Sequence, residues 1–123
     1  MVVIGKKTCP VNYTMCNQTV TVYHKEGDTI TRTVHKNAFF DYKKNQNVDK
    51  TGSREANAFL LVIPGEKQTV FVGDKVVRGD GPVISTREEW SSFIPVKVPG
   101  LVVVSYADPK YWGEQMVHTE GGG

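Results

Sequence analysis

Residues 57–65 read Asn-Ala-Phe-Leu-Leu-Val-Ile-Pro-Gly, and residues 68–81 read Gln-Thr-Val-Phe-Val-Gly-Asp-Lys-Val-Val-Arg-Gly-Asp-Gly. This stretch predicts a strand, a turn at Pro64-Gly65, a second apolar strand, and a short return through residues 75–77. The first strand, residues 59–63, is apolar on both faces and shows no polar alternation. Such a strand is expected in the middle of a small β-barrel or sandwich, so this stretch decides the fold class.

The same stretch contains two Gly-Asp pairs, Gly73-Asp74 and Gly79-Asp80. Glycine adopts positive φ without a steric penalty, and aspartate side chains bond to nearby backbone amides in turns. Both pairs are therefore predicted to form tight corners, which accounts for the two aspartates without a catalytic role.

The length and composition are those of one β-rich domain. The chain has 123 residues, of which 39% are hydrophobic and 23% charged, with 12 glycines and 6 prolines. This balance is typical of short strands joined by tight turns. The formal net charge of +2 is too small for a dedicated nucleic-acid footprint, and the densest basic pairs are Lys6-Lys7 and Lys43-Lys44.

No apolar run approaches the roughly 20 residues that span a bilayer, and the first residues lack the layout of a signal peptide. We therefore expect a protein made in the cytoplasm without membrane association.

Residues 1–18 are predicted to be an irregular amino-terminal arm that carries both cysteines, Cys9 and Cys16. Three interpretations of the cysteines remain open. A zinc site normally needs closer pairs of ligands, and a structural disulfide is uncommon in a reducing cytoplasm. Two free thiols is the interpretation that we prefer.

Residues 19–25 and 29–36 alternate between apolar and polar side chains around a Glu-Gly-Asp turn, which predicts a β-hairpin. Arg32 falls on the apolar face of the second strand, so we expect its guanidinium to reach the rim or to pair with a carboxylate. Residues 37–43, with two phenylalanines and a tyrosine, predict a third strand.

Residues 43–56 are polar and lack any period, which predicts a long loop that carries Lys43, Lys44, Lys50 and Arg54. Loops of this length inside a compact domain are usually functional or mobile. The loop either folds over a partner surface or is an ordinary solvated excursion, and both interpretations remain open.

Thr86 and Glu89 form a capping-box pattern, which predicts a short helix over residues 87–93. Trp90 and Phe93 are expected to share one side of this helix and to dock on the barrel.

The last quarter of the chain predicts a second strand that is apolar on both faces, residues 101–106, closed by Asp108-Pro109. An aromatic turn at residues 110–113 and a weak strand at residues 115–119 follow. Residues 121–123, three glycines, are expected to be a flexible end. The expected fold is mostly β, a small β-barrel or sandwich with one short helix, in a single domain at residues 19–120.

No constellation in the sequence points to catalysis. His24, His35 and His118 show no local metal-ligand spacing, and neither Ser53 nor Ser85 lies in a nucleophile elbow. The glycine-rich corner is followed by proline and lacks the helix that a phosphate-binding loop requires. We therefore predict no catalytic residues, no metal and no cofactor, hence a protein that is not an enzyme.

Several segments resemble small structural proteins of tailed phages that infect Firmicutes: Val20-Thr-Val-Tyr-His-Lys, Thr29-Ile-Thr-Arg-Thr-Val, Ala38-Phe-Phe-Asp-Tyr, Lys50-Thr-Gly, Ile63-Pro and Gly73-Asp-Lys-Val-Val-Arg-Gly. The resemblance covers residues 19–81. The order of the segments is similar to that of the head-completion or stopper proteins of long-tailed phages.

This resemblance implies a β-barrel that assembles into a ring beneath the portal and joins the DNA-filled head to the tail. It implies a virion protein of the neck, assembled in the host cytoplasm, with portal or adaptor proteins above, tail proteins below, and a role in retaining packaged DNA.

The resemblance also assigns residues. The loop at residues 43–56 would face the channel, where Lys43, Lys44, Lys50 and Arg54 would contact DNA phosphates nonspecifically. Exposed aromatic residues of the carboxyl-terminal part would form the subunit interface, where such residues concentrate, and the candidates are Tyr111 and Trp112.

Three alternatives remain. A tail-terminator or minor tail protein is a neighbouring virion role. A small β-barrel adaptor of a cellular complex predicts a monomer with a concave aromatic groove. An enzyme built on His24, His35 and a cysteine is the third, and it requires that His24→Ala abolish an activity without affecting folding.

Overall fold

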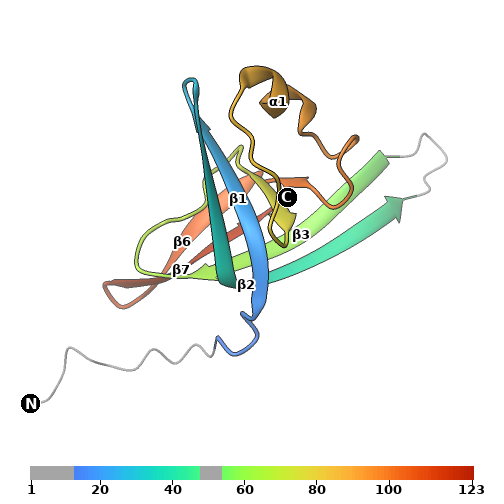
Figure 1. Cartoon of the computed structure of the whole chain (residues 1–123). Coiled ribbons are helices and arrows are strands. Elements are labelled where there is room, and N and C mark those ends of the chain that lie inside the picture. The colour runs from blue at the N-terminus through green and yellow to red at the C-terminus, as the bar shows by residue number, and fades with distance from the viewer. Residues whose placement is uncertain (1–12, 48–53) are drawn as a thin grey trace, which may run out of the picture.

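A computed structural model describes residues 13–47 and 54–123 (Figure 1). The elements in chain order are β1 (Gln18–Glu26), β2 (Thr29–Asn47), β3 (Arg54–Pro64), β4 (Lys75–Arg78), α1 (Arg87–Ser92), β5 (Val102–Val103), β6 (Tyr106–Trp112) and β7 (Gln115–Gly122).

The strands form one curled antiparallel sheet in the order β5-β4-β1-β2-β3-β7-β6. The expected fold class, mostly β and barrel-like with one short helix, is confirmed. The strand over residues 59–63 lies in β3, near the middle of the sheet, as its apolar composition predicts. The helix α1 lies over one end of the curled sheet (Figure 1).

The strand β2 is much longer than expected because two predicted strands are one. Its first part pairs with β1 up to Ala38, and its second part pairs with β3 from Phe39 onward. The β1–β2 pairing shifts register near Val20, which marks a bulge of the kind that bends a strand between two parts of a sheet.

The predicted loop at residues 43–56 is wrong over most of its length. Residues 43–47 pair in register with residues 54–58, so the polar segment is the extended end of the β2–β3 hairpin. The sequence reasoning failed because cross-strand hydrogen bonds hold a hairpin in place even where its side chains show no apolar period. Residues 48–53 lie outside the described residues.

The two edge strands of the sheet, β5 and β6, are consecutive in the chain and separated only by Val104 and Ser105. The Val104 amide donates to the Asp74 carbonyl oxygen at 2.9 Å, and the Gly73 amide donates to the Val104 carbonyl oxygen at 2.8 Å. The Ser105 amide and hydroxyl both donate to the Gly122 carbonyl oxygen, at 2.8 and 3.1 Å. These bonds hold the two edges of the curled sheet together.

Two clusters of buried side chains form the core. The larger cluster fills the inside of the curl and consists of Val20, Val22, Ala38, Phe40, Phe59, Leu61, Ile63, Val70, Val76, Val102 and Val104. The smaller cluster lies beneath α1 and consists of Tyr23, Val77, Ile84, Phe93 and Leu101, with Trp90 packed against it. The prediction that Trp90 and Phe93 dock on the sheet is confirmed.

The Gly-Asp corner at residues 79–81 is tied to the first hairpin. The Arg32 guanidinium pairs with the Asp80 carboxylate and donates to the Gly81 carbonyl oxygen, which confirms the expected carboxylate partner. The buried Thr21 hydroxyl donates to the Gly79 carbonyl oxygen and accepts from the Gly81 amide. Gly73 and Gly79 have φ of 92° and 81°, as predicted for the two corners.

The helix α1 begins as its sequence predicts. The Thr86 hydroxyl accepts from the Glu89 amide, and the Glu89 carboxylate accepts from the Thr86 amide. At the other end, the Lys75 ammonium donates to the Trp90 carbonyl oxygen at 2.6 Å and lies 4.3 Å from the centre of the Trp90 ring. A cation at this position stabilises the carboxyl end of a helix.

Two predicted strands differ from the structure. Residues 68–72 form no strand, although the return at residues 75–77 does, as β4. The predicted strand at residues 101–106 is reduced to the two residues of β5. Asp108-Pro109 does not close a strand but lies within β6, at the edge of the sheet, where a proline is tolerated.

The expected aromatic turn and flexible end are also wrong. Tyr111 and Trp112 end β6, and β7 continues to Gly122. Gly121 and Gly122 are buried between β3 and β6. A Cβ atom on Gly122 would lie 2.5 Å from the Tyr106 ring, so glycine is needed there for the aromatic ring to lie across the strand. The three glycines are therefore a packing requirement rather than a flexible end.

Deleting residues 121–123 is expected to destabilise the protein by at least about 2 kcal/mol, because the cut removes backbone pairing to two strands and the Gly122 acceptor of Ser105. Urea unfolding followed by circular dichroism measures this change. Glu114→Ala in the exposed β6–β7 turn is the control and leaves the midpoint unchanged. An unchanged midpoint for the deletion would show that the end of β7 is not part of the folded sheet.

Candidate functional site

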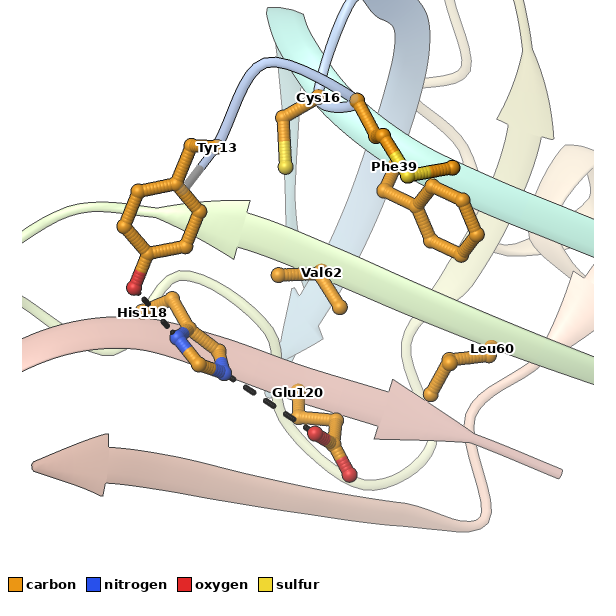
Figure 2. A pocket seen from close by; sticks show the side chains of 8 residues that line it. Tyr13, Cys16, Phe39, Leu60, Val62, His118 and Glu120 are labelled. Carbon is orange, nitrogen blue, oxygen red and sulfur yellow. Dashed lines mark hydrogen bonds and ion pairs between the residues drawn. The ribbon is translucent and has the colours of Figure 1, made fainter. Parts of the chain in front are cut away.

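An apolar groove lies on the outer face of the sheet, over β2, β3 and β7, and has a volume of about 320 Å³. Figure 2 shows the side chains that line it. They are Tyr13, Met15, Cys16, Phe39, Leu60, Val62, His118 and Glu120. We call this feature the outer groove.

The outer groove exists because β3 is apolar on both faces. Phe59, Leu61 and Ile63 point into the core, so the alternate residues Leu60 and Val62 point to the other face. Phe39 of β2 is the cross-strand partner of Val62 and adds an aromatic ring beside it.

One wall of the outer groove is the segment before β1. The Cys16 amide donates to the Tyr13 carbonyl oxygen at 2.9 Å, which makes a turn that lies against the sheet. Met15 at the rim of this turn is 67% exposed. The apolar face of β2 and β3 is therefore only partly covered by the chain.

The polar end of the outer groove is an aromatic and ionic contact. Tyr13 Oη and His118 Nδ1 are 2.7 Å apart, and the two rings meet edge to face with centres 5.5 Å apart. His118 Nε2 lies 3.9 Å from Glu120 Oε2 (Figure 2). Burial lowers the pKa of His118 and Lys110 lowers it further, against an opposing effect of Glu120. The imidazole is therefore neutral at pH 7.

A carboxylate pair borders this end. Asp108 and Glu120 are direct cross-strand partners, so their side chains lie on the same face of the sheet. Lys110 is the partner of His118 on the same two strands. Two carboxylates beside one ammonium give this border a net negative charge.

The chemistry of the outer groove favours binding. Burial raises the pKa of the Cys16 thiol, so the protonated and weakly nucleophilic form predominates at neutral pH. Apolar side chains form most of the lining, with a few polar atoms at one end, which is typical of a surface that holds an apolar group in one orientation.

The other histidines lie apart from this groove. His24 Nδ1 and the buried Asp74 Oδ1 are 2.6 Å apart, and Asp74 Oδ2 accepts from the Phe71 amide, so this pair fastens the corner before β4. Burial lowers the pKa of His35. Among the residues that the structure describes, no group of three or more His, Cys, Asp or Glu side chains is placed to hold a metal.

The basic residues predicted to face DNA come together on one hairpin. Lys43 and Lys44 belong to β2 and pair with Ala58 and Asn57, and Arg54 begins β3 opposite Asn47. Lys50 and Cys9 lie outside the described residues. These paired ends of β2 and β3 project beyond the rest of the sheet (Figure 1).

The predicted interface residues lie elsewhere. Tyr111 and Trp112 are next to the β6–β7 turn, where Tyr111 is 60% exposed and Trp112 is half-buried. The structure does not bring them to the basic hairpin, because β7 pairs with the Pro64 end of β3, away from Arg54.

Sequence reasoning missed the outer groove because its parts are distant in the chain: Tyr13 and His118 are separated by 105 positions. One signal was available. A strand with apolar residues on both faces requires a cover for its second face, and the segment before β1 supplies only part of it.

Comparisons with known proteins place the chain in a family. Residues 14–123 match the family of unknown function DUF6751, so the chain belongs to that family. No characterised protein and no solved structure matches it. No helix among the described residues is long and apolar enough to cross a membrane.

The depressed pKa of His118 predicts a loss of stability in acid. Because the folded state favours the neutral imidazole, the contribution is complete above the unfolded pKa of about 6.5 and is lost as the pH falls through the lower folded value. Urea unfolding at pH 7.5 and pH 5.5 is expected to show a smaller pH effect for His118→Gln than for the native chain.

His35 also has a pKa lowered by burial, so His35→Gln provides the matched comparison, and the pH effect that remains in each single variant belongs to the other histidine. An identical pH effect in the native chain and in His118→Gln would contradict the account of the Tyr13–His118 contact.

Proposed function

We propose that this protein is a structural component of a phage neck, which acts by assembling into a ring between the portal and the tail. The proposal rests on the resemblance of residues 19–81 to stopper proteins. The observation that carries it furthest is the projecting β2–β3 hairpin, whose paired ends hold Lys43, Lys44 and Arg54 beyond the body of the sheet.

In a ring, such hairpins from all subunits would surround a common channel. A few basic residues from each subunit would add up to a positive collar, although one chain has a net charge of only +2. A collar of this kind attracts the phosphate backbone of DNA without reading its sequence. This arrangement suits retention of packaged DNA, and the contact requires no catalytic chemistry.

An adaptor of a cellular complex is the second candidate, and the outer groove is the observation that favours it. That alternative predicts a monomer with an aromatic-lined groove, and Tyr13 and Phe39 line such a groove. The two candidates differ in oligomeric state, which is directly measurable.

The expected result is a closed ring. Sedimentation velocity across a wide concentration range should show one large species, electron microscopy should show it as a ring, and labelling should place the chain at the neck of virions. A chain that remains monomeric with portal and tail extracts, and that is absent from virions, would overturn the neck proposal and leave the adaptor as the first candidate.

Charge removal tests the proposed contact with DNA. The double change Lys43→Gln with Lys44→Gln is expected to weaken nonspecific DNA binding by the assembled protein and to reduce the salt dependence of log K by about two units. The matched control is Lys36→Gln with Lys67→Gln, two exposed lysines outside the hairpin end. Equal losses in both double variants would show that the hairpin has no special contact with DNA.

A further inference from the structure

The outer groove has an apolar floor and a negatively charged border, and this combination defines its occupant. Leu60 and Val62 leave part of their surface uncovered, so an apolar side chain gains by lying against them. Asp108 and Glu120 lie side by side, and like charges in direct cross-strand partners destabilise a sheet unless a cation neutralises them. The occupant should present an apolar side chain next to a basic one.

The described chain offers that combination at the turn after α1, residues 95–98, which read Pro-Val-Lys-Val. Val96 is 92% exposed, and the adjacent Lys97 is also exposed. We call this segment the Val96 turn.

The Val96 turn is held firmly by the rest of the protein. The Lys97 and Val98 amides both donate to the Ile94 carbonyl oxygen, at 3.0 and 2.9 Å, and the Leu101 amide donates to the Val98 carbonyl oxygen. Val98 also packs against the smaller core cluster. A segment already fixed in one conformation loses little entropy when it binds, so an exposed valine here is a prepared contact.

The turn and the groove lie on opposite sides of β3. Phe59 of β3 lines a cavity together with Pro95, at the edge of the core, whereas the next residue, Leu60, lines the outer groove. Because consecutive residues of a strand point to opposite faces, the sheet itself separates the two sites. The Val96 turn therefore does not lie in the outer groove of its own chain, but a second copy can supply it.

We propose that the Val96 turn of one copy binds in the outer groove of the next copy, with Val96 against Leu60 and Val62 and with Lys97 beside Glu120 and Asp108. This contact joins two different surfaces, and a head-to-tail contact of that kind generates a ring when its rotation closes. The inference rests on the ring assembly proposed above and names the surfaces that form it.

A charge exchange tests the contact. Lys97→Glu and Glu120→Lys are each expected to weaken assembly by about tenfold or more, because each places like charges together. The double variant restores the opposite charges and is expected to recover most of the native assembly. Sedimentation velocity measures the association, and circular dichroism confirms that each variant is folded.

A matched pair of valines tests the apolar part. Val96→Asp is expected to abolish assembly, whereas Val83→Asp, at a valine that is 73% exposed in the loop before α1, leaves it unchanged. Native rings in Val96→Asp, or failure of the double charge variant to recover, would overturn this inference while leaving the ring proposal intact. A native chain that never assembles would overturn both proposals.

Discussion

The fold depends on the closing of a curled sheet by its own chain. The two edge strands follow one another directly, and the two residues between them bond on one side to Asp74 and on the other to Gly122. An open sheet has two edges with unpaired backbone groups, which are a hazard for aggregation. Here Val104 and Ser105 satisfy their backbone groups across the gap, and the apolar interior is enclosed as a consequence.

This closure determines which surfaces remain for function. With the inner face of β3 committed to the core, its outer face is the only other place for Leu60 and Val62, and the segment before β1 covers them in part. The same β3 continues with β2 beyond the core as the basic hairpin. A channel-facing element and an apolar groove are thus two consequences of one long central hairpin, which suits a protein that acts by assembly.

Local patterns predicted much of the fold. The hairpin of β1 and β2, the core strand in β3, the capping box of α1 and the glycine corners all follow from interactions within a few residues. The errors concern long-range pairing: residues 43–47 look like loop until residues 54–58 pair with them, and the terminal glycines look flexible until Tyr106 crosses them. The outer groove could not be predicted for the same reason, since Tyr13 meets His118 only through the folded sheet.

Amide hydrogen exchange at Val104 and Ser105 tests the closure most directly. Both amides donate to carbonyl oxygens across the junction, at 2.9 and 2.8 Å. If the junction holds the sheet closed, both amides should exchange only through global unfolding, with the same opening free energy as the slowest amides of β3. Exchange at the rate of a frayed strand end, with β3 still protected, would show that the sheet is an open layer and would contradict this account.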